Sequence, residues 1–176
     1  MGIPMIFSGA GLGSGHTVHT PTQLLDVFPT ILRSTGVAVC DEDTELLGTP
    51  LQQIAAGDRP ERAIISEQHS AGCRSAIFMA RKDNFKYVHY IDYPAQLFDL
   101  ESDPFESNDL ATQPEFASTL CAMEAVLGEY LDPERVDATA KADQQVRLDA
   151  AGGYAAVAAQ GSHGYTPAPG EKPDFG

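Results

Sequence analysis

Four short runs rich in Ile, Val, Phe and Tyr follow one another between residues 63 and 100, and they constrain the fold more than any other feature. The runs are Ala63–Glu67, Ala76–Ala80, Lys86–Ile91 and Gln96–Leu100. The pairs between them are turn formers: Ala71-Gly72, Asp83-Asn84 and Tyr93-Pro94. Short β-prone runs divided by such turns are typical of consecutive antiparallel strands. The sequence therefore predicts a four-stranded antiparallel meander.

The residues before these runs predict a strand and two helices. Ile3–Ser8 is a short apolar run, which is typical of a buried strand. From Leu24 to Leu32 the apolar residues recur at helical spacing, and Gly36 follows as a helix end. Pro29 lies inside this pattern and should bend the helix. Residues 51–56 predict a second, short helix.

The residues after the meander predict two more helices. The stretch Pro114–Leu131 carries an apolar stripe that a sheet could cover. Asp132-Pro133 then begins a helix that reaches about Ala151 and ends at two glycines. Residues 162–176 are rich in Gly and Pro and predict an extended tail. The whole is an α/β chain in which helices and an antiparallel sheet are segregated, as in α+β folds.

Charge excludes several classes of partner. The chain of 176 residues has 25 Asp and Glu against 11 Lys and Arg, a formal net charge of −14. Nucleic acids and anionic membrane surfaces both require basic footprints, so neither is expected as a partner. No apolar run approaches the length that spans a bilayer, and no basic stretch marks a signal peptide. Three scattered cysteines without a CxxC pair suit a reducing compartment, and a cytoplasmic location is expected.

The glycine cluster Gly9–Gly15 suggests a phosphate-binding loop, but its spacing does not fit one. A dinucleotide fingerprint would need glycine at Ser14 or at His16, depending on where it starts. No Lys-Ser or Lys-Thr pair follows, which excludes a P-loop. A plain loop after the first run is the expectation.

Several of these segments resemble a known family. Pro4-Met-Ile-Phe-Ser-Gly-Ala-Gly11, followed by Asp26-Val-Phe-Pro-Thr30 and Gly36, resembles a late segment of the sulfatases, which belong to the alkaline phosphatase superfamily. Phe85-Lys-Tyr-Val88 and Leu97-Phe-Asp-Leu-Glu-Ser-Asp-Pro104 resemble the C-terminal subdomain of that family. The resemblance runs from Pro4 to Ala111 and places the start of this chain in the middle of a family member.

The resemblance implies an architecture. Residues 1–60 would form the C-terminal edge of the alkaline-phosphatase-like α/β domain, with its terminal strand and helix. Residues 61–131 would form the small antiparallel four-stranded sheet packed on a C-terminal helix. Residues 132–176 would supply a second helix and an extended tail.

It also implies a chemistry that this chain does not carry by itself. Sulfatases hydrolyse sulfate esters with a formylglycine made from a C/S-x-P-x-R motif, and with a divalent metal, Ca²⁺ or Mg²⁺/Mn²⁺. None of Cys40, Cys73 and Cys121 fits that motif, and no serine does. The metal ligands would lie before Pro4. This chain is therefore expected to have no catalytic residue and no metal of its own.

Two alternatives remain open. The chain could be a non-catalytic binding or assembly module, or the remnant of a phosphate or phosphonate ester hydrolase of the same superfamily. If the chain is a fragment of a sulfatase and stands alone, the apolar residues of the strand at Ile3 and of the helix after Leu24 lack the large sheet on which they would pack. An exposed apolar face and self-association are then expected.

His69 and Glu67 are the candidate substrate-binding residues. They stand at the end of a predicted strand before a glycine turn, and the resemblance places this junction near the rim of the substrate pocket. An imidazole there could donate a hydrogen bond to a sulfate oxygen or to the leaving group. Glu67 could contact a polar or cationic leaving group. The plainer alternatives are a surface histidine and an ordinary ion-pair partner.

Overall fold

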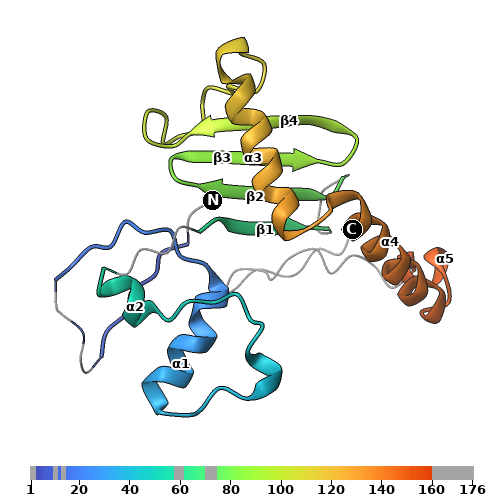
Figure 1. Ribbon diagram of the computed structural model, residues 1–176. Helices are drawn as coiled ribbons and strands as arrows, with labels where there is room; N and C mark the ends of the chain where they lie inside the picture. Colours follow the sequence, from blue (N-terminus) through green and yellow to red (C-terminus); the bar gives the residue numbers. More distant parts are fainter. Residues whose placement is uncertain (1–2, 10–11, 13–14, 58–61, 70–74, 160–176) are drawn as a thin grey trace, which may run out of the picture.

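The centre of the molecule is the predicted meander (Figure 1). The computed structural model describes residues 3–9, 12, 15–57, 62–69 and 75–159. The strands are β1 (Ile64–Gln68), β2 (Ile77–Lys82), β3 (Phe85–Tyr90) and β4 (Tyr93–Asp99). They form one antiparallel sheet in the order β1-β2-β3-β4. The predicted four-stranded sheet is confirmed.

One of the turns differs from the prediction. β2 and β3 are joined at Asp83-Asn84 as expected, with Asp83 in the left-handed region at φ 51°. The next turn lies at Ile91-Asp92, where Asp92 has φ 65°, and not at Tyr93-Pro94. Tyr93 pairs with Tyr90 and begins β4. β4 is an edge strand, which tolerates a proline because one side of it needs no ladder donor. The Ala71-Gly72 pair lies outside the described residues.

A helix covers one face of the sheet. α3 (Ala117–Tyr130) follows the 3₁₀ turn η3 (Pro114–Phe116) and crosses the strands in front of the sheet in Figure 1. The core between them contains the fully buried Phe78, Leu97 and Leu127. Because Ala80 lies two residues from Phe78 on the same face, its small side chain lets the helix approach. The predicted helix and its packing on the sheet are confirmed.

The segment before the sheet is helical but loosely packed. η1 (Leu24–Asp26) leads into α1 (Val27–Thr35), and α2 (Leu51–Ala55) follows a single acidic turn, η2 (Asp41–Asp43). Gly36 ends α1 at φ 71°, as its position predicted. Pro29 falls in the first turn of α1, directly after the change from 3₁₀ to α geometry. The expected local distortion therefore takes the form of that change.

The predicted strand at Ile3–Ser8 is wrong. Residues 3–9 have no regular secondary structure, and the side chain of Ile6 is 95% exposed. A strand is stable only when a neighbour pairs with its backbone. Within the described part of the chain β1 pairs with β2 alone, and nothing pairs with residues 3–9. The apolar pattern is present, but the sheet it would join is not.

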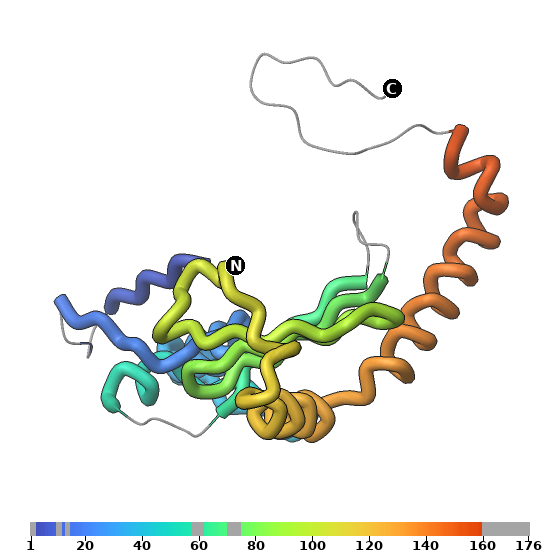
Figure 2. The backbone as a smooth tube through the Cα atoms, turned by 90° about the horizontal axis from the view of Figure 1, so that it is seen from above, coloured from blue at the N-terminus to red at the C-terminus, as the bar shows by residue number. Residues whose placement is uncertain are grey.

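The last described elements extend away from the sheet. α4 (Pro133–Ala150) begins at Asp132, whose side chain accepts a hydrogen bond from the Arg135 backbone N–H at 3.1 Å. Its predicted bounds are confirmed. α5 (Tyr154–Ala158), which the sequence did not predict, follows two glycines of positive φ. Figure 2 shows α4 and α5 as an arm projecting from the body. The predicted tail lies outside the described residues.

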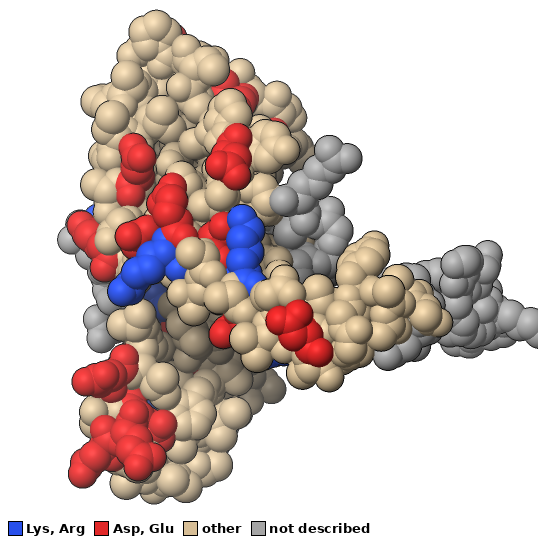
Figure 3. All heavy atoms as spheres, turned by 90° about the vertical axis from the view of Figure 1, so that its right-hand side faces the viewer, with Lys and Arg blue, Asp and Glu red and all other residues tan. Residues whose placement is uncertain are grey.

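The surface is acidic, as the composition requires. On the side drawn in Figure 3, Asp and Glu side chains are spread over the body and few Lys and Arg lie between them. Among the described residues, no helix combines the length and apolar character needed to cross a membrane.

Candidate functional site

The structure brings the two candidate residues together at the end of β1. His69 directly follows the strand, and its Nε2 lies 3.5 Å from Oε2 of Glu67. The His69 side chain is 20% exposed and that of Glu67 is 50% exposed. The Glu67 side chain is therefore accessible to solvent, whereas both ring nitrogens of His69 are buried and have no hydrogen-bond partner among the described residues.

The His69 ring is held by the sheet and by α4. It meets the buried ring of Phe78 edge-on, with centroids 5.3 Å apart and an interplanar angle of 77°. The side-chain amide of Gln144 in α4 donates a hydrogen bond to the His69 carbonyl oxygen at 3.1 Å. An edge-on aromatic contact adds to the energy of burial, and the carbonyl bond fixes the backbone. These contacts orient the imidazole without occupying its nitrogens.

A second imidazole–carboxylate pair lies on the other side of Phe78. His89 in β3 is in register with Phe78, and its Nε2 lies 3.4 Å from Oε1 of Glu134 at the start of α4. The ring centroids of Phe78 and His89 are 6.4 Å apart. This pair was not predicted from the sequence. The available signal was the register of the meander, which places Glu67, Phe78 and His89 in one row.

Tyr87 borders the second pair. Its hydroxyl lies 3.3 Å from Nδ1 of His89. Burial, and then the negative charges of Glu124 and Glu134, raise the pKa of Tyr87 from 10.0 to about 12. The tyrosine is therefore a neutral hydrogen-bonding group over the physiological range and cannot act as a base there.

The chemistry open to His69 is that of a hydrogen-bond or proton donor. A histidine beside a carboxylate can carry a proton on the nitrogen that faces an acceptor, and a charged donor binds an anionic oxygen strongly. The residues of the described chain do not fit a metal, since no group of three or more His, Cys, Asp or Glu is placed to hold one. No step is therefore assigned to a metal on this chain.

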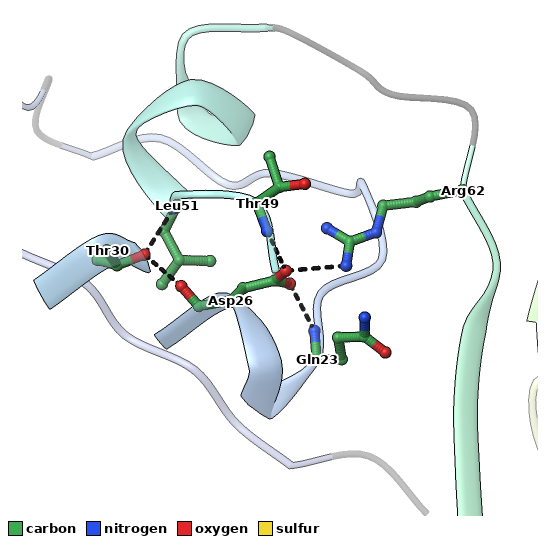
Figure 4. A network of polar contacts seen from close by, with 6 residues as sticks. All are labelled: Gln23, Asp26, Thr30, Thr49, Leu51 and Arg62. Carbon is green, nitrogen blue, oxygen red and sulfur yellow. Dashed lines mark hydrogen bonds and ion pairs between the residues drawn. The ribbon is translucent and has the colours of Figure 1, made fainter. Parts of the chain in front are cut away.

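A separate polar network ties the first helices to the sheet (Figure 4). Asp26 is fully buried. Its Oδ2 accepts from the Gln23 backbone N–H at 2.8 Å, and its Oδ1 accepts from Thr49 N–H at 2.9 Å and from Nη2 of Arg62 at 2.8 Å. Thr30 extends the network, since its hydroxyl accepts from Leu51 N–H at 2.8 Å. Because Arg62 stands just before β1, the network joins α1 to the sheet. It is structural.

Most large exposed apolar side chains of the described residues lie between Ile3 and Leu47. They are Ile3, Ile6, Val18, Leu24, Leu25, Phe28, Ile31, Val37, Val39, Leu46 and Leu47, together with the less exposed Met5 and Phe7. We call this set the N-terminal apolar face. Contiguous apolar patches mark surfaces that another polypeptide covers. The exposed apolar side chains expected for the helix after Leu24 are present.

Curated proteins similar to this chain are sulfatases. A choline-sulfatase of Rhizobium meliloti is 30% identical over 149 residues, which are 82% of this chain and 29% of that protein. Arylsulfatase K of Gallus gallus is 28% identical over 146 residues, 78% of this chain and 27% of the relative. No family model matches the sequence. The chain thus spans less than a third of the length of these relatives.

Solved structures agree with the sequence comparison. A putative sulfatase of Bacteroides thetaiotaomicron matches with a TM-score of 0.52 and 28% identity, over 60% of this chain and 23% of that one. A 2-O GAG sulfatase matches with the same values. The identities and the share of each relative that is covered agree with one assignment. The chain is the C-terminal portion of a sulfatase, a family within the alkaline phosphatase superfamily.

Proposed function

We propose that this chain is part of an enzyme that hydrolyses sulfate esters, and that it contributes support and a rim to the active site without its nucleophile or metal. The observation that carries the proposal is the similarity to sulfatases over 82% of the chain. The absence of a C/S-x-P-x-R motif from the sequence assigns the nucleophile to another part of the enzyme. Formylglycine and a divalent metal, Ca²⁺ or Mg²⁺/Mn²⁺, would be supplied there as well.

The surfaces of this chain have separate roles in the proposal. Residues 1–60 belong to the edge of the catalytic α/β domain, residues 61–131 form the supporting sheet with α3, and residues 132–176 carry α4 and the tail. The N-terminal apolar face packs on the remainder of the α/β domain, because burial of such side chains is the main source of stability at an interface. Without that remainder the face would drive self-association.

His69 and Glu67 are proposed as substrate-binding residues at the rim. In this proposal a ring nitrogen of His69 donates to a sulfate oxygen or to the leaving-group oxygen. Both ring nitrogens are buried and have no hydrogen-bond partner among the described residues, so a ligand that reaches them would find a donor free. Glu67 is half exposed, so it can also reach a polar or cationic leaving group. Both are binding residues in this proposal, and His69 is held in place by Phe78 and by the bond from Gln144.

Hydrolysis of synthetic esters by the complete enzyme tests the activity. 4-Nitrophenyl sulfate, 4-nitrophenyl phosphate and a 4-nitrophenyl phosphonate share one leaving group, so their kcat/KM values compare the esters directly. The sulfate is expected to be the preferred substrate. Preference for the phosphonate or the phosphate would overturn the proposal. If this chain binds a complementing chain and neither hydrolyses any ester, it is an assembly module.

Substitution of the two histidines tests the rim. His69→Gln should raise KM for the sulfate ester about 10-fold or more, because one charge-assisted hydrogen bond to the substrate is lost. His89→Gln is the matched control, since His89 has the same type of carboxylate partner and touches the same Phe78 ring. Equal effects of the two variants would show that His69 has only a structural role.

A further inference from the structure

The β3–β4 hairpin carries a shallow cavity that the proposed function does not use. Tyr90 and Tyr93 are register partners across the hairpin. Together with Pro94, Gln96, Asp109 and Thr112 they line a cavity of about 380 Å³. The cavity lies at β4, the edge of the sheet opposite β1, and so it is separated from Glu67 and His69 by two strands.

Aromatic surface is available in this cavity. The side chain of Tyr93 is 57% exposed although it belongs to a strand. The hydroxyl of Tyr90 donates a hydrogen bond to Oε1 of Gln96 at 2.8 Å, which holds that ring in the wall. Tyrosine faces carry negative charge density from their π electrons and attract cations. The oxygen of the Tyr90 hydroxyl keeps lone pairs that can face the cavity.

The cavity also carries an uncompensated negative charge. Asp109 is half-buried, and its Oδ1 accepts from the backbone N–H groups of Leu97 at 3.1 Å and Ala111 at 2.9 Å. None of the ion pairs formed among the described residues involves Asp109, whereas nearby Glu106 is paired with Lys86. Burial, then Asp109 and Glu106, raise the pKa of Tyr90, so the potential at its hydroxyl is negative.

We propose that the cavity lined by Tyr90, Tyr93 and Asp109 binds a small quaternary ammonium compound. Such a cation is weakly hydrated, and it gains from ring faces and one carboxylate without requiring hydrogen-bond acceptors in a fixed shell. A small hard metal ion would need several more oxygen ligands than the cavity offers. Anions are repelled by Asp109. The binding is independent of sulfate-ester hydrolysis.

Titration of the chain with tetramethylammonium chloride tests this inference. Backbone amide resonances are followed by two-dimensional NMR, with sodium chloride at the same ionic strength as the reference. Saturable shifts are expected at Tyr90, Tyr93 and Thr112, with a dissociation constant on the order of 1 mM. tert-Butanol, a neutral molecule of similar size, should bind at least about fivefold more weakly.

Three variants separate the contributions. Tyr93→Leu keeps apolar bulk but removes the ring face, and it should weaken binding about fivefold. Asp109→Asn keeps an oxygen for the two backbone N–H groups but removes the charge, and it should weaken binding by a similar factor or more. Tyr154→Leu, at an exposed tyrosine on α5, is the control and should change nothing. Unsaturable shifts, equal binding of tert-butanol, or full affinity in Tyr93→Leu or Asp109→Asn would each overturn the proposal.

Discussion

In the sheet with α3 the largest side chains meet one another in the centre, whereas between Leu24 and Ala55 most of them point outward. Phe78, Leu97 and Leu127 are fully buried in the first region. In the second region the fully buried side chain is Asp26, and its partners are Arg62 and backbone N–H groups. One region is held by apolar packing, and the other by a polar junction anchored to its neighbour.

This difference indicates which part of the chain can be stable by itself. A sheet covered by a helix buries apolar area in proportion to its contacts and needs no further partner. A helix whose apolar side faces water gains little from its own hydrophobic residues. The region around α1 therefore depends on its junction with Arg62 and on whatever covers the N-terminal apolar face.

The largest expected effect falls on the packed region. Phe78→Ala should lower the free energy of unfolding of the sheet by about 3–5 kcal/mol, because a fully buried aromatic ring is replaced by a cavity. Urea denaturation followed by circular dichroism measures it. Phe105→Ala, at a ring that is 89% exposed, should change the same quantity by less than about 0.5 kcal/mol. Equal effects would contradict the packing described here.

The polar junction of Asp26 with Arg62 should be disrupted without unfolding of the sheet. Asp26→Asn keeps the shape of the side chain but leaves the guanidinium of Arg62 buried without a counter-charge, which costs about 3 kcal/mol. Hydrogen exchange should speed up at the amides of Thr49 and Leu51 and stay unchanged at Leu97. Asp41→Asn, at an exposed carboxylate, serves as the control. Faster exchange throughout the sheet would mean that the two regions unfold as one.

Alkaline pH should lower the free energy of unfolding of the sheet and leave the junction of Asp26 with Arg62 unchanged. Because the pKa of Tyr87 rises from 10.0 to about 12 on folding, the folded state holds its proton more tightly than the unfolded state. This contribution is complete below pH 10 and is lost as the pH rises to 12, by about 1–2 kcal/mol. Unfolding free energies measured across this range should show the loss, and Tyr87→Phe should flatten it. An unchanged slope in Tyr87→Phe would assign the loss to another group.

The smallest effect on stability is expected at the N-terminal apolar face. Leu24→Ser and Ile31→Ser remove side chains that are already exposed, so each should change the free energy of unfolding by less than about 0.5 kcal/mol. Binding of an apolar dye and self-association measured by sedimentation should nevertheless fall. Val146→Ser on α4 is an equally exposed control outside the face. If dye binding persists in the double variant, the face does not act as a docking surface.

Local patterns predicted the elements that depend on local contacts. Alternating β-prone runs located all four strands, and Gly36 marked the end of α1. The strand expected at Ile3–Ser8 failed because strand pairing depends on a neighbour that the pattern does not contain. The turn at Ile91-Asp92 was missed because Asp92 takes a left-handed conformation that the Tyr93-Pro94 pair obscured.

The candidate site was predicted only in part, and for a related reason. Glu67 and His69 are close in sequence, so their proximity could be anticipated from β1 alone. His89 and Glu134 come from a strand and a helix 45 positions apart, and their contact depends on how α4 leaves α3. The junction of Asp26 with Arg62 likewise depends on the path of the whole segment between them.

The order of the strands has a consequence for how quickly the sheet forms. Each strand pairs only with the strand before or after it in the chain, so the loops that must close are short. Short loop closures require little entropy, and domains dominated by such neighbouring contacts fold faster than those with distant pairings. During synthesis the sheet and α3 can assemble as soon as residue 131 has left the ribosome. The sheet and α3 therefore do not need α4 to reach their native topology.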